Sequence, residues 1–386
     1  MKVLTVVGTR PEAIKMAPVI KEMARHTGLI TQVVCATAQH REMLDQALGI
    51  FGIVPDHDLG VMRPNQSLSE LTANLLRALD EVVVMERPDW VLVQGDTTTA
   101  MTAGLVAFYR GVRLAHVEAG LRSNDRTQPF PEEVNRRIAD MLADLCFAPT
   151  ERNRQYLLRE GVHPQAIFVT GNPGIDALLM TVNRVGHRSL EDLIGSVDRR
   201  RLILVTVHRR ESFGSRLLSV CEALRQIAQR YSRDVHIVFP VHRNPRVWKP
   251  VQQVLSSLPN VSLLEPVDYE TAVFLLSKSD FVLTDSGGLQ EEAPSLHKPV
   301  LVLRTVTERP ELVDLGGARL VGTDPRTIVE ETDRLLSDQV LFEQMASVPN
   351  PYGDGAASQR IVTAILAAAE GETGVQARGL GPDRFD

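Results

Sequence analysis

Short runs of aliphatic and β-branched residues alternate with amphipathic helical stretches along this chain, and no other feature restricts the fold as strongly. Such alternation is typical of β-α-β units, whose parallel strands are covered by helices on both faces. The first half contains expected strands at residues 2–8, 31–36, 90–94, 113–117, 145–148 and 167–170. The second half contains them at 202–207, 236–239, 261–264, 281–284, 300–303 and 318–321. The sequence therefore predicts an α/β protein with two successive doubly wound sheets.

The length of 386 residues also fits about two domains of ordinary size. A Gly-Asn-Pro-Gly segment at 171–174, a polar helix and a charged run separate the two strand series, so we expect domains at 1–170 and 171–355. The Ala-rich residues 356–372 predict a helix that packs back on the first domain. Residues 373–386 are rich in glycine and charge, and we expect them to be disordered.

Composition excludes several functional classes. A formal charge of −6 gives no reason to expect nucleic acid or an anionic membrane as a partner. Cys35, Cys146 and Cys221 are widely spaced, which indicates buried reduced thiols in a cytoplasmic protein. The N-terminal apolar run is too short for a signal peptide or a membrane span. No zinc-binding, Walker or GxGxxG motif occurs, so neither a metal nor a tightly held dinucleotide is expected.

Polar residues gather at the C-terminal ends of the expected strands, which is where open α/β sheets bind ligands. Two sheets facing each other would direct these ends into one cleft between the domains. The strand-end residues are Gly8, Thr9, Arg10, Gly95, Asp96, Glu118, His208, Arg209, His242 and Arg243.

The segment Leu283–Leu303 predicts a nucleotide diphosphate site. A strand runs into Asp285, Ser286, Gly287 and Gly288, where a helix begins. Free backbone N–H groups and the positive end of a helix favour a phosphate there, and a glutamate one turn later could reach ribose hydroxyls. The alternative is an ordinary glycine-rich turn with a serine N-cap.

Basic residues follow other strands. Arg10 and Lys15 bracket the start of the first helix and could clamp a diphosphate, although solvated charges at a β-α turn are equally expected there. His208 leads into a basic turn, so a protonated ring that stabilises a departing phosphate is favoured over a core histidine. Arg309, before Pro310, could close on the pyrophosphate or the sugar.

Three carboxylates are candidates for proton transfer. Asp96 and Glu118 follow neighbouring strands, and Glu132 lies just inside a helix that starts at Pro131. Singly, Asp96 could be an N-cap and Glu132 could merely complement the helix dipole. Together, they would bring several carboxylates to one edge of a sheet, an arrangement that suits removal and return of a proton.

With these motifs in view, the chain resembles the non-hydrolysing UDP-N-acetylglucosamine 2-epimerases. The resemblance extends from "VVGTRPEAIKMAP" through "GDTTTA", "HVEAGLR", "PEEVNRR", "HRRESFG" and "LTDSGGLQEEAPS" to "NPYGDG". It implies the GT-B architecture of two facing Rossmann-like domains and reversible conversion of UDP-GlcNAc to UDP-ManNAc for bacterial surface polysaccharides. It further implies elimination of UDP to 2-acetamidoglucal followed by re-addition, a homodimer, and no cofactor.

Residue roles carry over from the resemblance by position. It implies catalytic roles for Asp96, Glu118, Glu132 and His208. It implies substrate binding by Arg10, Lys15, Arg136, Arg209, Ser286, Gly287, Gly288, Glu292 and Arg309. Gln39, His40 and His242 resemble a region where some bacterial members bind a second UDP-GlcNAc as an activator.

The chain departs from the family pattern at several positions. Pro173 and Gly174 replace Thr and Val at the expected hinge, which could alter domain closure. Thr305 replaces an aspartate beside the site. Ala272 replaces a phenylalanine near uracil, and the lost ring contact would cost roughly 0.5–1.5 kcal/mol unless Phe274 or Tyr269 compensates.

Three alternatives remain open at the level of sequence. A hydrolysing relative would release free ManNAc and UDP because water captures the intermediate. A GT-B glycosyltransferase is supported by fold alone, which is a weak argument for activity. A nucleotide-sugar-binding protein without catalysis would keep the Ser-Gly-Gly turn, although the intact carboxylates argue against it.

Overall fold

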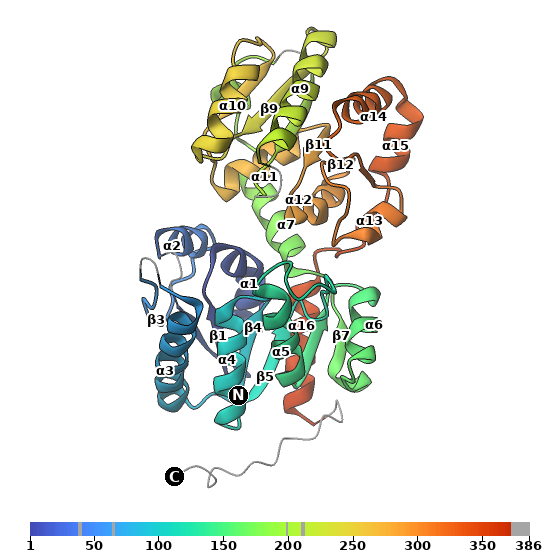
Figure 1. Ribbon diagram of the computed structural model, residues 1–386. Helices are drawn as coiled ribbons and strands as arrows, with labels where there is room; N and C mark the ends of the chain where they lie inside the picture. The colour runs from blue at the N-terminus through green and yellow to red at the C-terminus, as the bar shows by residue number, and fades with distance from the viewer. Residues whose placement is uncertain (38–40, 64–65, 198–199, 210–212, 372–386) are drawn as a thin grey trace. The chain divides into compact units, whose positions relative to one another are not determined.

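The computed structural model describes residues 1–37, 41–63, 66–197, 200–209 and 213–371. Its contacts divide the chain into two compact units (Figure 1). Unit 1 comprises residues 1–177 and 352–386, and unit 2 comprises residues 178–351. The division falls inside helix α7 (Pro173–Val185). The expected tail at 373–386 lies outside the described residues.

Unit 1 is built on a seven-stranded parallel sheet in the order β3-β2-β1-β4-β5-β6-β7. Its strands are β1 (Lys2–Val7), β2 (Thr31–Ala36), β3 (His57–Asp58), β4 (Trp90–Gln94), β5 (Arg113–Val117), β6 (Leu145–Ala148) and β7 (Ile167–Val169). Its helices besides α7 are α1 (Arg10–Met23), α2 (Arg41–Ile50), α3 (Leu68–Glu86), α4 (Thr98–Tyr109), α5 (Glu132–Leu142), α6 (Glu151–Arg159) and α16 (Ala357–Ala369), with 3-10 turns at Ala24–His26 and Pro164–Ala166. The strand order reverses between β1 and β4, and ligands bind at such switch points in doubly wound sheets.

Unit 2 repeats the plan with a six-stranded parallel sheet in the order β10-β9-β8-β11-β12-β13. Its strands are β8 (Arg201–Thr206), β9 (Val235–Pro240), β10 (Val261–Leu264), β11 (Phe281–Thr284), β12 (Val300–Val302) and β13 (Ala318–Leu320). Its helices are α8 (Glu191–Ile194), α9 (Ser215–Arg230), α10 (Pro245–Leu255), α11 (Tyr269–Lys278), α12 (Gly287–Glu292), α13 (Pro310–Asp314), α14 (Pro325–Ser337) and α15 (Gln339–Ala346), with a 3-10 turn at Ala293–Leu296. The switch point here lies between β8 and β11.

Both sheets confirm the predicted fold class of two Rossmann-like units. Their central strands are covered by helices and read as continuous apolar runs, as expected for parallel sheets. In β4 every residue is buried, and in β11 likewise. β3 was not predicted, because it has only two residues and no apolar run. Its position depends on Asp56, whose carboxylate accepts from the Val34 N–H at 2.8 Å.

Helix α16 brings the C-terminal part of the chain back to unit 1, where it packs against α1. The buried carboxylate of Asp176 accepts from the Ser358 N–H at 2.9 Å and from its hydroxyl at 2.6 Å. Ile361 and Ile365 are fully buried. Among the described residues, no helix has both the length and the apolar character that crossing a bilayer requires.

Candidate active site

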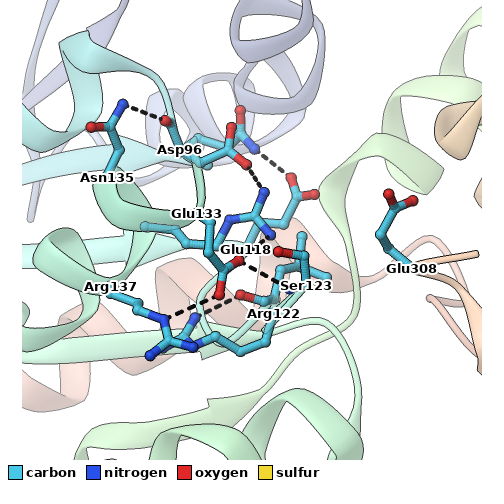
Figure 2. A network of polar contacts seen from close by, with 12 residues as sticks. Asp96, Glu118, Arg122, Ser123, Glu133, Asn135, Arg137 and Glu308 are labelled. Carbon is cyan, nitrogen blue, oxygen red and sulfur yellow. Dashed lines mark hydrogen bonds and ion pairs between the residues drawn. The ribbon is translucent and has the colours of Figure 1, made fainter. Parts of the chain in front are cut away.

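Asp96 follows β4 at the switch point of unit 1. Thr97, not Asp96, caps helix α4, since its hydroxyl accepts from the Ala100 N–H at 3.1 Å. The N-cap interpretation of Asp96 is therefore wrong, and its carboxylate instead pairs with the guanidinium of Arg136. The Asn135 side-chain amide donates to the Asp96 carbonyl at 3.0 Å (Figure 2). The Asp96 side chain is 29% exposed, so it is held by the protein and open to solvent.

Glu118 follows β5, the neighbour of β4 in the sheet, and is almost completely buried. Its backbone has a φ of +65°, an unusual conformation for a residue other than glycine. One carboxylate oxygen lies 2.6 Å from the Lys15 ammonium and also accepts from the Gln94 amide. Strained backbone held by buried contacts is often found at functional sites. The strand pairing brings the turns that carry Asp96 and Glu118 side by side, because the Gly95 N–H donates to the Val117 carbonyl at 3.0 Å.

The two glutamates that open α5 have different environments. Glu133 is fully buried and accepts from the Ser123 N–H at 2.9 Å and from Arg137 Nε at 3.1 Å (Figure 2). It therefore anchors the preceding loop. Glu132 is only partly buried, and its carboxylate has no hydrogen bond or ion pair to any residue that the structure describes. Glu132 is thus the member of the pair that remains available to a ligand.

Arg136 is a buried arginine whose guanidinium contacts two carboxylates. It reaches Asp96 from one amino group and Glu133 at 3.4 Å from the other. Its Nε is enclosed and has no hydrogen-bond partner within the described part of the chain. Arg10 is the first residue of α1 and is partly exposed, so unit 1 places several cations around the ends of β1, β4 and β5.

Glu12 is a buried carboxyl group that the sequence analysis did not single out. It accepts from the Gly8 N–H at 3.1 Å and from the Thr97 hydroxyl at 2.7 Å, and so connects the turns after β1 and β4. Burial raises the pKa of Glu12 to about 7, and the hydrogen bonds from Thr97, Thr9 and Gly8 lower it only in part.

This pKa makes the stability of the protein dependent on pH. The folded state holds the Glu12 proton more tightly than the unfolded state, so the contribution of Glu12 to stability is fully present below about pH 4.5 and is lost as the pH rises through about 7. We expect Glu12→Gln to remove this dependence, which amounts to at most about 3 kcal/mol. Urea unfolding at pH 5 and pH 7.5 measures it, with Glu81→Gln on exposed α3 surface as the control. A stability difference between Glu12→Gln and the parent that does not change with pH would contradict the assignment.

In unit 2, Asp285 organises the switch point. It is fully buried, and its carboxylate accepts from the N–H of His208 at 3.1 Å and of Arg209 at 3.0 Å. The His208 ring Nδ1 lies 3.3 Å from the same carboxylate, while the ring itself is half exposed. Asp285 therefore holds His208 and Arg209 beside the end of β11. The place of Asp285 in the turn is predictable from the sequence, but its hydrogen bonds to His208 and Arg209, 77 and 76 residues away, depend on the fold.

Two arginines converge on the glycine turn after β11. A Cβ placed on Gly287 would lie 3.6 Å from Arg209 and 3.7 Å from Arg309, so both guanidinium groups border this glycine. Ser286 caps α12 by accepting from the Leu289 N–H at 3.4 Å. Since α12 has only six residues, the arginines contribute most of the positive charge at this turn.

Carboxylates in turn hold these arginines. Glu291 is buried and pairs with Arg309 Nε. Glu308 contacts Arg304 at 2.8 Å and Arg209 at 3.4 Å. Burial raises the pKa of Glu308. The hydrogen bond from Arg304 and the charges of the nearby arginines outweigh the effect of burial, so the pKa of Glu308 is lowered to about 2. Glu292 is partly buried near Tyr269.

The remaining predicted positions differ in their surroundings. His242 is exposed, and its Nδ1 accepts from the Asn244 N–H at 3.1 Å. Gln39 and His40 lie outside the described residues. Among the residues that are described, no three His, Cys, Asp or Glu side chains gather as metal ligands would.

Two departures from the family pattern have a local explanation. Pro173 is the first residue of α7, where its missing N–H breaks no helical hydrogen bond. A Cβ on Gly174 would lie 3.5 Å from the Lys15 side chain, so this glycine borders the lysine that pairs with Glu118. Phe274 is almost completely buried, with the Lys278 ammonium 5.6 Å from the centroid of its ring.

Comparison with known proteins agrees with this geometry. The family described as UDP-N-acetylglucosamine 2-epimerase matches residues 21–366. The UDP-N-acetylglucosamine 2-epimerase of Escherichia coli K12 is 50% identical over 95% of this chain and 98% of its own length. The chain belongs to this epimerase family. The predicted family and the predicted type of enzyme are thereby confirmed, and no observation favours the hydrolysing alternative.

Solved structures of epimerases show the same fold. The enzyme from Neisseria meningitidis, determined bound to UDP-GlcNAc, has a TM-score of 0.88 and 47% identity and covers 95% of this chain and 100% of its own. The enzyme from Methanocaldococcus jannaschii, determined with UDP-GlcNAc and UDP, has a TM-score of 0.78 and 33% identity over 95% and 99% of the two chains. Both are GT-B-like proteins with two parallel sheets, as in this epimerase.

Proposed function

We propose that the protein interconverts UDP-GlcNAc and UDP-ManNAc by reversible epimerisation at C2. The observation that carries the proposal is the pair of carboxylates at the ends of adjacent strands, with Asp96 held by Arg136 and Glu118 held by Lys15. A proton acceptor and a proton donor near one carbon are what such a reaction needs. The likeness to epimerases determined with UDP-GlcNAc supports the same substrate here.

In the proposed reaction the C2–H and C1–O bonds break, which yields 2-acetamidoglucal and UDP. UDP then adds again at C1 while a proton reaches the opposite face of C2. We assign proton transfer to Asp96, Glu118 and Glu132 together, because their environments differ in charge and burial.

Unit 2 supplies the groups that stabilise UDP as a leaving group. Arg209 and Arg309 border Gly287 and can donate to a diphosphate in bidentate geometry. His208, held by Asp285, adds a donor beside them. We assign Ser286, Gly287 and Gly288 to the phosphates and Glu292 to the ribose, as the resemblance implies.

Loss of Arg309 tests the diphosphate site. We expect Arg309→Ala to weaken UDP binding by about 10- to 100-fold, because it removes a charged donor and leaves buried Glu291 without its guanidinium partner. Calorimetric titration with UDP measures the change. Arg319→Ala, which breaks an ion pair between β13 and Glu331 of α14, is the matched control and should leave affinity unchanged. Equal affinities of Arg309→Ala and the parent would exclude Arg309 from the site.

The reaction itself is tested by proton NMR of the protein with UDP-GlcNAc in deuterated water, without added metal or NAD. We expect UDP-ManNAc to accumulate with deuterium at C2. Free ManNAc and UDP would instead identify a hydrolysing enzyme. Binding of the nucleotide sugar without product or exchange would contradict catalysis altogether.

We also propose that the protein is a homodimer located in the cytoplasm. Exposed apolar side chains lie near the C-terminal ends of α3, α4 and α5, and α4 packs against both of the other helices: Val84, Met85, Phe108, Tyr109 and Met141. Apolar surface gathered in this way is typical of a subunit interface. All three cysteines are buried thiols, which fits a reducing compartment.

Charge introduced on this surface should separate the subunits. We expect the double substitution Met85→Glu, Met141→Glu to halve the mass measured by light scattering after size-exclusion chromatography, because two charges would be buried in the interface. Val340→Glu, at an exposed apolar residue of α15, is the control. A parent protein that elutes as a monomer would exclude the dimer.

A further inference from the structure

His116 is a completely buried histidine on β5 with a polar partner at each ring nitrogen. Its Nδ1 lies 2.7 Å from the Asp140 carboxylate, and its Nε2 lies 2.7 Å from the Gly95 carbonyl oxygen. Neither partner has a proton to donate when Asp140 is ionised. Both ring nitrogens must then donate, so the ring is an imidazolium.

The charges around His116 balance this positive ring. Asp140 is buried on α5 and also contacts Arg122 at 2.7 Å, and Arg122 contacts Glu160 at 2.5 Å. Two carboxylates thus face two cations. Burial raises the pKa of Asp140, but the charges and hydrogen bonds of His116 and Arg122 outweigh it and keep this pKa below its usual value. Asp140 therefore supplies the negative charge that a buried imidazolium requires.

The hydrogen bonds of this pair end at the two turns that carry the proposed proton-transfer groups. His116 donates to the carbonyl of Gly95, the residue before Asp96. Asp140 accepts from the Gly120 N–H at 3.2 Å, two residues after Glu118. Both turns have left-handed backbone, with φ of +73° at Gly95 and +65° at Glu118. One buried ion pair thus links both turns to helix α5.

We propose that His116, held by Asp140, is a positioning residue that fixes the Gly95–Asp96 turn relative to Glu118 for proton transfer at C2. The inference rests on the proposed function. His116 touches no substrate, and its effect passes through the Gly95 carbonyl. A shift of about 1 Å in a reacting group can lower the reaction rate by about 100-fold. The hydrogen bond from His116 to the Gly95 carbonyl is therefore expected to affect the rate of proton transfer by Asp96.

The test compares His116→Gln and the milder Asp140→Asn with the parent. We expect kcat for epimerisation to fall by about 10- to 100-fold in His116→Gln and by about 10-fold in Asp140→Asn. KM for UDP-GlcNAc and the Kd for UDP should change less than about twofold in both, because nucleotide binding is assigned to unit 2. His236→Gln is the matched control, since His236 is a buried strand histidine of unit 2 that contacts Ser262 at 2.8 Å. It should retain the parent kcat.

Two results would overturn the inference. One is a folded variant of either residue with the parent kcat, and the other is a loss of kcat accompanied by an equal loss of UDP affinity. A third measurement needs no variant: nitrogen NMR of the parent protein should show protons on both ring nitrogens of His116, and a neutral ring would refute the imidazolium. Absence of epimerisation by the parent enzyme would instead refute the proposed function, while the NMR result would still stand.

Discussion

Replacement of Asp96 by asparagine is expected to lower kcat for epimerisation by about 10³–10⁴-fold. General acid–base catalysis contributes about 10²–10⁴-fold, and the substitution also removes the negative charge that Arg136 neutralises. Arg136 is buried, and its Nε has no hydrogen-bond partner among the described residues, so the substitution would leave Glu133, at 3.4 Å, as the carboxylate that its guanidinium contacts. The Kd for UDP should remain within about twofold of the parent value, since no group assigned to the diphosphate is altered. Deuterium incorporation at C2 and product formation are the measurements.

Asp80→Asn is the matched control for this substitution. Asp80 also pairs with an arginine, Arg110 at 2.5 Å, but both side chains are well exposed on the surface of unit 1. We expect its kcat to equal that of the parent. Near-normal turnover of a correctly folded Asp96→Asn variant would remove Asp96 from the proton-transfer groups.

Replacement of Gly120 by alanine is expected to lower the free energy of unfolding by about 2–5 kcal/mol. Gly120 has a φ of +83°, and a Cβ there would lie 2.4 Å from the carbonyl oxygen of Asn153. The left-handed backbone costs an L-residue about 1–2 kcal/mol, and the overlap with a main-chain atom adds about 1–3 kcal/mol. Urea denaturation measures the loss.

Gly161→Ala separates the two contributions. Gly161 has a similar φ of +87°, but nothing lies within 4 Å of its Cβ position. We expect the free energy of unfolding of this variant to fall only by the cost of the left-handed backbone conformation, about 1–2 kcal/mol. If both variants were destabilised equally, close packing of Gly120 on Asn153 would not be the cause.

The pattern of apolar and polar residues along the chain was sufficient to predict most of the strands. The ranges 261–264 and 281–284 coincide with β10 and β11. β11 is buried throughout, as expected for an apolar run covered on both faces, whereas β10 is a partly buried edge strand. The predicted ranges of β2, β4, β5 and β6 are also exact, and the other predicted strands differ by one residue at one or both ends. β3 could not be predicted, since a two-residue edge strand is defined by its neighbour β2 and not by its own residues.

The candidate site could be predicted only in part. Asp96 and Glu118 follow apolar strands, so their position at the C-terminal edge of the sheet was readable from the sequence. Glu12 and Asp285 were not recognised as anchors, because their contacts depend on the fold: Thr97 lies 85 residues from Glu12, and His208 lies 77 residues from Asp285. His116 did leave a signal, since a histidine within the apolar run of β5 must find buried partners.

The return of α16 to α1 has a consequence for synthesis of the chain. Unit 1 is interrupted by unit 2, and its last helix is made only after residue 351. The whole of unit 2 is therefore synthesised before α16, with its buried Ile361 and Ile365, can pack against α1. Domains generally fold as they emerge, so here the later unit can become complete before the earlier one. A nascent chain stalled before residue 352 should expose the α1 surface to chaperones and proteases, however well its second unit has folded.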